Sequence, residues 1–153
     1  MIKYARVGID EQVLRLLKKL EPDFPAQSVV LDVENNFVSV VKVLYDEKVY
    51  GVLVIRGEMT HKKELKLVID HAIAEEELSV AFSSILAESL FDFAKEQGFA
   101  IIEQRAHKPG LARMLKTHYG EPKEWIFKKE LSTWEKGQAQ AIRHKQQAPQ
   151  TTA

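Results

Sequence analysis

The sequence predicts a domain of the α/β (α+β) class, with one mixed sheet of about six strands and three to four helices on its faces. Three observations lead to this prediction. Strand-like segments over residues 37–45, 49–57 and 64–74 follow one another through short polar turns, as in a meander. The strongest helical pattern, from Glu75 to Gly98, separates the last of these from another short apolar segment, which requires parallel or splayed pairing. Finally, 153 residues, 45% of them hydrophobic, suffice for the core of one domain.

The first part of the chain is predicted to form one strand followed by one or two helices. Residues 2–7 (IKYARV) form a predicted strand. Asp10 then stands where it can cap a helix whose apolar residues recur at helical spacing. Pro22 and Pro25 end that helix, because proline cannot continue the hydrogen-bond ladder. We expect a second short helix or an irregular stretch over residues 26–36.

The segment 37–45 (FVSVVKVLY) fits two patterns. Its apolar residues match a helical stripe, but four valines in nine residues favour a strand. A polar turn over residues 46–48 joins it to the apolar run at 49–57, so we predict a hairpin. Residues 64–74 alternate with period two and add the third strand of the meander.

The long helix is expected to begin at the acidic residues Glu75–Glu77, because negative charge is favourable at a helix N-terminus. Gly98 ends it. Residues 99–102 (FAII) are wholly apolar, which is typical of a short strand buried on both faces.

Pro109 opens a last helix that runs to about Tyr119, and Gly120 closes it. Residues 125–131 (WIFKKEL) alternate as a closing strand. The apolar side of the helix holds Leu111, Met114, Leu115 and His118.

Composition excludes several classes of protein. The 22 basic and 22 acidic side chains balance, which argues against binding nucleic acid through the overall field. The absence of cysteine excludes disulfides and thiolate sites, and the five histidines form no metal-binding signature. No apolar run is long enough to span a membrane and no apolar signal segment begins the chain, so we expect a soluble protein of the cytoplasm.

Residues 132–153 differ from the rest of the chain. They are rich in Gln, Ala and Thr and hold three basic side chains against one acidic, so they bury little apolar surface. We therefore expect a domain over residues 1–131, followed by a polar, weakly basic tail over residues 132–153. This tail is either a solvated end or a segment that orders on a protein partner.

Two stretches resemble a known family. FDFAKEQGFAIIEQ (residues 91–104) looks like the end of the acetyl-CoA helix and the next strand of the GCN5-related N-acetyltransferases (GNAT). HKPGLARMLKTHYGEPKEWIFKKEL (residues 107–131) looks like that family's following helix, its glycine and its closing strand. The whole succession over residues 2–131 is similar to the GNAT order, and the size is similar to short phage-encoded GNAT-like proteins.

The resemblance implies a GNAT-like mixed central sheet and transfer of an acetyl group from acetyl-CoA to the amine of a small molecule or a protein. An alternative is a catalytically inactive GNAT-fold binding or structural protein, such as a component of a phage particle, which would place the protein in host cytoplasm or virion.

The resemblance also places the cofactor. Family members hold its pyrophosphate on a glycine-rich turn and on the N-terminus of the following helix. That turn falls on residues 78–83 (LSVAFS), where small residues replace the glycines and Leu78 replaces the basic residue. Glu75–Glu77 precede it and would repel an anion, which favours the alternative. The cofactor-binding candidates are Ile73, Ala74, Leu78, Ser79, Ala81, Phe82 and Ser83.

Four residues are candidates for proton transfer. An amine must lose a proton, and Asp70 or His71 on the third meander strand could accept it. Being adjacent, these two should point to opposite faces, so that only one faces the site. Lys116, at the family's tyrosine position, or the nearby Tyr119 could protonate the leaving thiolate. The ordinary alternative is a satisfied polar pair on the strand and a solvated lysine on the helix.

Overall fold

The computed structural model describes residues 1–106, 109–123 and 129, and it divides the chain into two compact units, Met1–Gly120 and Glu121–Ala153. The predicted strand over 125–131, apart from Lys129, and the tail over 132–153 lie outside the described residues. The first unit contains, in order, β1 (Ile2–Val7), α1 (Glu11–Leu17), a 3₁₀ turn η1 (Lys18–Leu20), α2 (Ala26–Glu34), β2 (Ser39–Tyr45), β3 (Lys48–Met59), β4 (Leu65–Ala74), α3 (Val80–Glu96), β5 (Ile101–Gln104) and α4 (Pro109–Tyr119).

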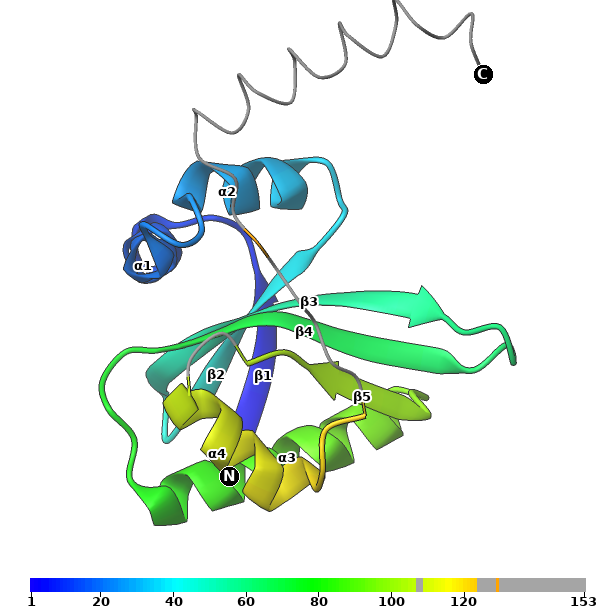
Figure 1. Ribbon diagram of the computed structural model, residues 1–153. Helices are drawn as coiled ribbons and strands as arrows, with labels where there is room; N and C mark the ends of the chain where they lie inside the picture. The colour runs from blue at the N-terminus through cyan, green and yellow to red at the C-terminus, as the bar shows by residue number, and fades with distance from the viewer. Residues whose placement is uncertain (107–108, 124–128, 130–153) are drawn as a thin grey trace, which may run out of the picture. The chain divides into compact units, whose positions relative to one another are not determined.

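The described strands form one sheet in the order β1-β2-β3-β4-β5. Neighbours from β1 to β4 pair antiparallel, and β4 pairs with β5 in parallel through the crossover helix α3. Figure 1 shows α1 and α2 on one face of the sheet and α3 and α4 on the other. The predicted mixed α+β architecture and the parallel pairing after the meander are therefore confirmed.

The face under α1 and α2 holds the packed core. Asp10 caps α1, because its carboxylate accepts a hydrogen bond from the Val13 amide at 2.8 Å. This orientation buries Val13, Leu16 and Leu17 completely against the sheet. Each such side chain contributes about 1.5–3 kcal/mol. The whole cluster comprises Val13, Leu16, Leu17, Ala26, Val29, Val40, Val52, Val54 and Ile73.

Helix α3 begins later than predicted. Ser79 is its N-cap, with the hydroxyl accepting from the Phe82 amide at 3.1 Å. Glu75 instead continues the strand pairing, since its backbone N–H donates to the Tyr50 carbonyl at 2.8 Å. The prediction that Glu75–Glu77 start the helix is therefore wrong, because the β3–β4 ladder extends past the end of β4.

The two predicted helix-ending glycines are confirmed by their backbone. Gly98 and Gly120 have φ of 89° and 85°, in the left-handed region that glycine adopts without strain. Strand β5 differs from the prediction. Ile101 is 39% exposed and the strand is not buried on both faces, because in the described part of the chain a strand lies on only one side of it. Among the described residues, no helix has the length and apolar character needed to cross a membrane.

Candidate functional site

The pairing of strand β4 with β3 is interrupted at Asp70. His71 pairs with Val54 and Ile69 pairs with Ile55, so Asp70 is an extra residue without a partner on β3, which defines a β-bulge. The parallel ladder with β5 ends one residue earlier, where Ile69 pairs with Gln104, while β4 runs on to Ala74. Within the described residues, the last part of β4 therefore has no strand on its β5 side. We call this gap beside residues 70–74 the β4–β5 opening.

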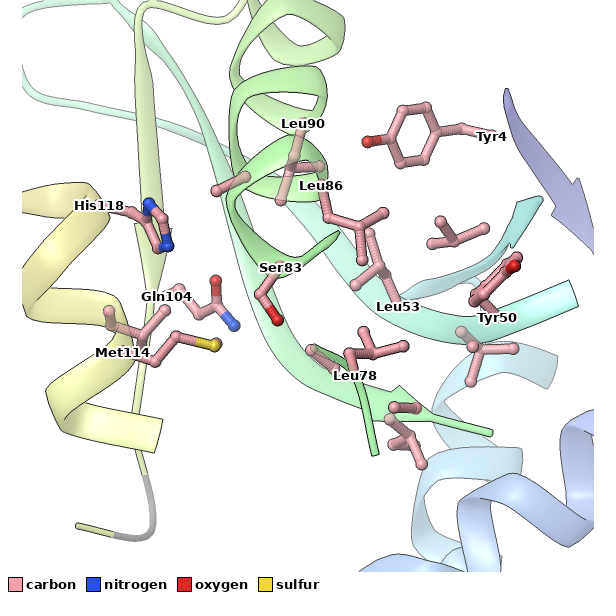
Figure 2. A pocket seen from close by; sticks show the side chains of 18 of the residues that line it. Tyr4, Tyr50, Leu53, Leu78, Ser83, Leu86, Leu90, Gln104, Met114 and His118 are labelled. Atoms are coloured by element: carbon pink, nitrogen blue, oxygen red, sulfur yellow. The ribbon is translucent and has the colours of Figure 1, made fainter. Parts of the chain in front are cut away.

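A cavity of about 320 Å³ lies on the α3 and α4 side of the opening, and we call it the α3 cavity. Figure 2 shows side chains from α3, α4 and the sheet around it. Four predicted cofactor-binding residues line it: Ile73, Ala74, Leu78 and Ser83. The other lining residues are Tyr4, Val43, Tyr50, Gly51, Val52, Leu53, Ala72, Leu86, Ala87, Leu90, Gln104, Met114, Leu115, His118 and Tyr119.

Polar groups gather where the α3 cavity meets β5 and α4. The Tyr119 hydroxyl donates to Gln104 Oε1 at 2.9 Å, and its ring packs edge-on against Phe91 at 5.0 Å. Burial raises the pKa of Tyr119 above its usual value. In the part of the chain that the structure describes, neither the His118 imidazole nor the amide nitrogen of Gln104 has a hydrogen-bond partner, so both are available to a ligand.

The opposite face of the opening has its own hollow of about 220 Å³, which we call the α1-side hollow. Asp70 and His71 both line it. The Asp70 carboxylate binds Arg56 Nε at 3.0 and 3.2 Å, and the His71 ring lies 4.8 Å from that of Phe24. The expectation that only one of Asp70 and His71 faces the site is wrong, because the bulge at Asp70 breaks the alternation of the strand. The remaining lining residues are Lys19, Leu20, Asp23, Ile69, Ala72, Ile73, Ala74, Gln104 and Arg105.

The α3 cavity and the α1-side hollow share lining residues at the opening. Residues 72–74 of β4 and Gln104 of β5 line both of them. A molecule seated in the opening could therefore contact the apolar α3 side and the polar α1 side at once.

The turn between β4 and α3 is acidic. Glu75 pairs with Arg15 at 2.6 Å, and the Lys19 ammonium donates to the Ala74 and Glu75 carbonyls at 3.0 and 2.8 Å. Glu76 and Glu77 line a third hollow of about 270 Å³ beside the start of α3. We call it the acidic hollow; it is also lined by Lys48, Val49, Tyr50, Glu75, Leu78, Ser79 and Phe82.

Four predicted residues lie apart from the opening. Ser79 uses its hydroxyl to cap α3, and the Phe82 ring packs against that of Tyr50 at 4.6 Å. Ala81 is exposed and lines none of the three hollows. Lys116 is also exposed and lines none of them, whereas Tyr119 reaches the α3 cavity.

Sequence reasoning missed two polar residues of the site, Gln104 and His118. The signal for His118 was present, because it shares the apolar side of its helix with Met114 and Leu115. Gln104 is the last residue of β5, so its position depends on where the β4–β5 ladder ends. That end is a property of the sheet rather than of the local sequence.

No model of a protein family matches the sequence, and no curated protein matches it. Solved structures are similar at low identity. A ribosomal-protein-alanine N-acetyltransferase from Brucella melitensis biovar Abortus 2308 aligns at a TM-score of 0.59 and 13% identity, covering 86% of this chain and 100% of that one. An aminoglycoside acetyltransferase from an uncultured soil metagenomic sample, in complex with sisomicin, aligns at 0.56 and 15%, covering 86% and 95%. An aminoglycoside N-acetyltransferase in complex with CoA aligns at 0.56 and 12%, covering 86% and 96%. The chain has the GNAT fold.

The GNAT fold implies acetyl-CoA, and the residues present fit one end of that molecule. The opening and the apolar α3 cavity suit an acyl group and its thioester. The acidic hollow does not suit a diphosphate, because its lining contains three carboxylates, those of Glu75–Glu77, and one lysine, Lys48. In addition, the Ser79 hydroxyl already accepts the N–H of Phe82 at the start of α3.

Proposed function

We propose that the protein is a GNAT-type N-acyltransferase that moves an acyl group from a thioester to an amine. The observation behind this proposal is the β4–β5 opening, where residues 72–74 and Gln104 line both an apolar cavity on one face and a hollow with charged side chains on the other. Transfer between two substrates needs two spaces that adjoin at one point, because the acyl group and the amine must meet while their other parts stay separate.

His71 is the proposed base. An amine is protonated near neutral pH, so it must lose a proton before it can attack. Asp70 and His71 both line the α1-side hollow, and the Asp70 carboxylate accepts from Arg56 Nε with both oxygens. We assign the role of base to His71 because imidazole is the side chain whose ordinary pKa lies closest to neutral pH. Histidine exchanges protons near neutral pH, directly or through water.

His118 is the proposed acid on the other side of the opening. When bound, an acyl-CoA supplies a thioester whose carbonyl carbon bonds to the amine nitrogen while its C–S bond breaks and the sulfur leaves as a thiolate that takes up one proton. Tyr119 is a weaker acid than an ordinary tyrosine because burial raises its pKa, so we assign the donor role to His118. The Tyr119–Gln104 hydrogen bond then positions the end of β5 beside it.

The test measures binding and transfer on the full chain. Acetyl-CoA should raise the melting temperature in a concentration-dependent way. With a panel of primary amines, appearance of free CoA thiol should depend on the amine. His71→Asn and His118→Asn should each lower the rate by about 10²–10⁴-fold, whereas His61→Asn, a change at an exposed residue of the β3–β4 turn, should not.

A second candidate is a GNAT-fold protein without catalysis, serving as a binding or structural component such as part of a phage particle. The acidic hollow favours it, because Glu75–Glu77 oppose the diphosphate of CoA. Absence of any stabilisation by millimolar acetyl-CoA, together with an unchanged thiol signal for every amine, would reject the transferase and support this second function.

A further inference from the structure

The α3 cavity is larger than an acetyl group requires. It begins at Ala74 of β4, beside the opening, and extends to Val43 of β2 and Tyr4 of β1. Three strand spacings separate β4 from β1 in the sheet, a distance of about 14 Å. Its volume of about 320 Å³ corresponds to about ten groups of the size of a water molecule. An acetyl group presents only one methyl beyond its carbonyl.

The distant part of the α3 cavity is apolar. Figure 2 shows Leu86 and Leu90 projecting from α3 toward the space that Leu53 and Tyr50 line. The Tyr4 hydroxyl donates a hydrogen bond to Ser89 Oγ of α3 at 3.1 Å. The cavity therefore offers hydrocarbon and aromatic surface away from the opening and polar groups near it.

The packing of α3 supports the same conclusion. Of the residues in this helix only Ala94, near its C-terminal end, is buried. Leu86 and Leu90 are only half-buried although they face the sheet side, whereas Leu16 of α1 on the other face is fully buried. An apolar stripe held off the sheet in this way gains stability when an apolar ligand fills the space.

We propose that the acyl donor carries a fatty acyl chain of about eight carbons, and that this chain lies in the α3 cavity with its thioester at the β4–β5 opening. This inference rests on the proposed function and names its donor. The polar residues Gln104 and His118 at one end and the leucines at the other set the direction of the chain.

The first test is a chain-length series on the full chain by titration calorimetry, with acetyl-CoA, hexanoyl-CoA and octanoyl-CoA. Each methylene taken up by the cavity should raise the affinity by up to about fourfold. We expect octanoyl-CoA to bind at least about tenfold more tightly than acetyl-CoA. Equal affinities across the series would overturn the inference and leave the transferase proposal intact, and no binding of any thioester would reject both.

A matched pair of variants locates the chain. Leu86→Trp fills the cavity and should reduce the ratio of octanoyl-CoA to acetyl-CoA affinity toward one. Ile85→Trp adds the same ring on the adjacent residue, which is 53% exposed and does not line the cavity, and should keep the wild-type ratio. Ala87→Leu is a smaller filling change for use if Leu86→Trp does not fold. An unchanged ratio in folded cavity variants would place the chain elsewhere and overturn the inference.

Discussion

Gly51 is predicted to be intolerant of even one methyl group. It lies on β3 opposite Ala74 and lines the α3 cavity. A Cβ atom built on it would lie 2.3 Å from the carbonyl oxygen of Ile73 and 3.0 Å from the Cα of Ala74. Both are backbone atoms of β4 beside the opening, so relief requires the strands to separate rather than a side chain to rotate.

The expected loss for Gly51→Ala is about 1–3 kcal/mol, the usual cost of inserting a methylene into a packed site. For a chain of this length, a loss of about 2 kcal/mol lowers the melting temperature by about 4–8 °C. Urea unfolding gives the free energy and calorimetry the temperature. Because Ala74 borders the opening, acyl-CoA affinity should fall as well.

Gly57→Ala is the control on the same strand. Its Cβ would meet only the Phe99 ring, at 3.6 Å, an ordinary contact. We expect its stability to stay within about 0.5 kcal/mol of the wild type. Equal stability of the two variants would refute the close approach of β3 and β4 at Gly51, and with it the described geometry of the opening.

Three further changes test the electrostatics. Burial raises the pKa of Tyr119, so above about pH 10 the unfolded chain loses a proton that the native state keeps, and the free energy of unfolding falls as pH rises. Tyr119→Phe should remove up to about 1.4 kcal/mol per pH unit of that fall, measured by urea unfolding. Hydrogen bonds from Lys42 and the Val13 amide lower the pKa of Asp10, so this stabilising cap is lost as pH falls through that lowered pKa, and Asp10→Asn should flatten the acid limb of the stability curve. The double change Glu76→Lys and Glu77→Lys should tighten acetyl-CoA binding about tenfold at low salt. It should leave the affinity for S-acetylpantetheine unchanged, because that ligand lacks the phosphates. Equal gains for both ligands would contradict repulsion between this turn and the phosphates.

Local patterns were sufficient for most of the fold. The cap at Asp10 and the glycine ends at Gly98 and Gly120 depend on neighbouring residues, and all three are confirmed. The start of α3 was missed because it depends on a competition. The Glu75 amide pairs with the Tyr50 carbonyl across the sheet, and that long-range bond outweighs the helical tendency of three acidic residues.

The site was less accessible to sequence reasoning. The sequence predicts Asp70 and His71 as neighbours on a strand. It does not predict the bulge that lets both line the same hollow, because a bulge depends on the register with β3. Of the two residues predicted on the last helix, Tyr119 lines the cavity and Lys116 does not, and His118, which the prediction left out, lines it as well. A prediction can miss by a few residues along a helix or strand where tertiary packing, rather than sequence spacing, sets the orientation of a side chain.

The unequal packing of the two faces has a consequence for how the molecule opens. The amides of α1, which lie over the completely buried Val13, Leu16 and Leu17, should exchange with deuterium slowly, close to the rate set by global unfolding. The amides of α3, which lie over the cavity, should exchange faster through local fluctuations. The side of the domain with the largest local fluctuations is therefore the side through which an apolar ligand would enter. A ligand bound in the α3 cavity would slow amide exchange in α3 first.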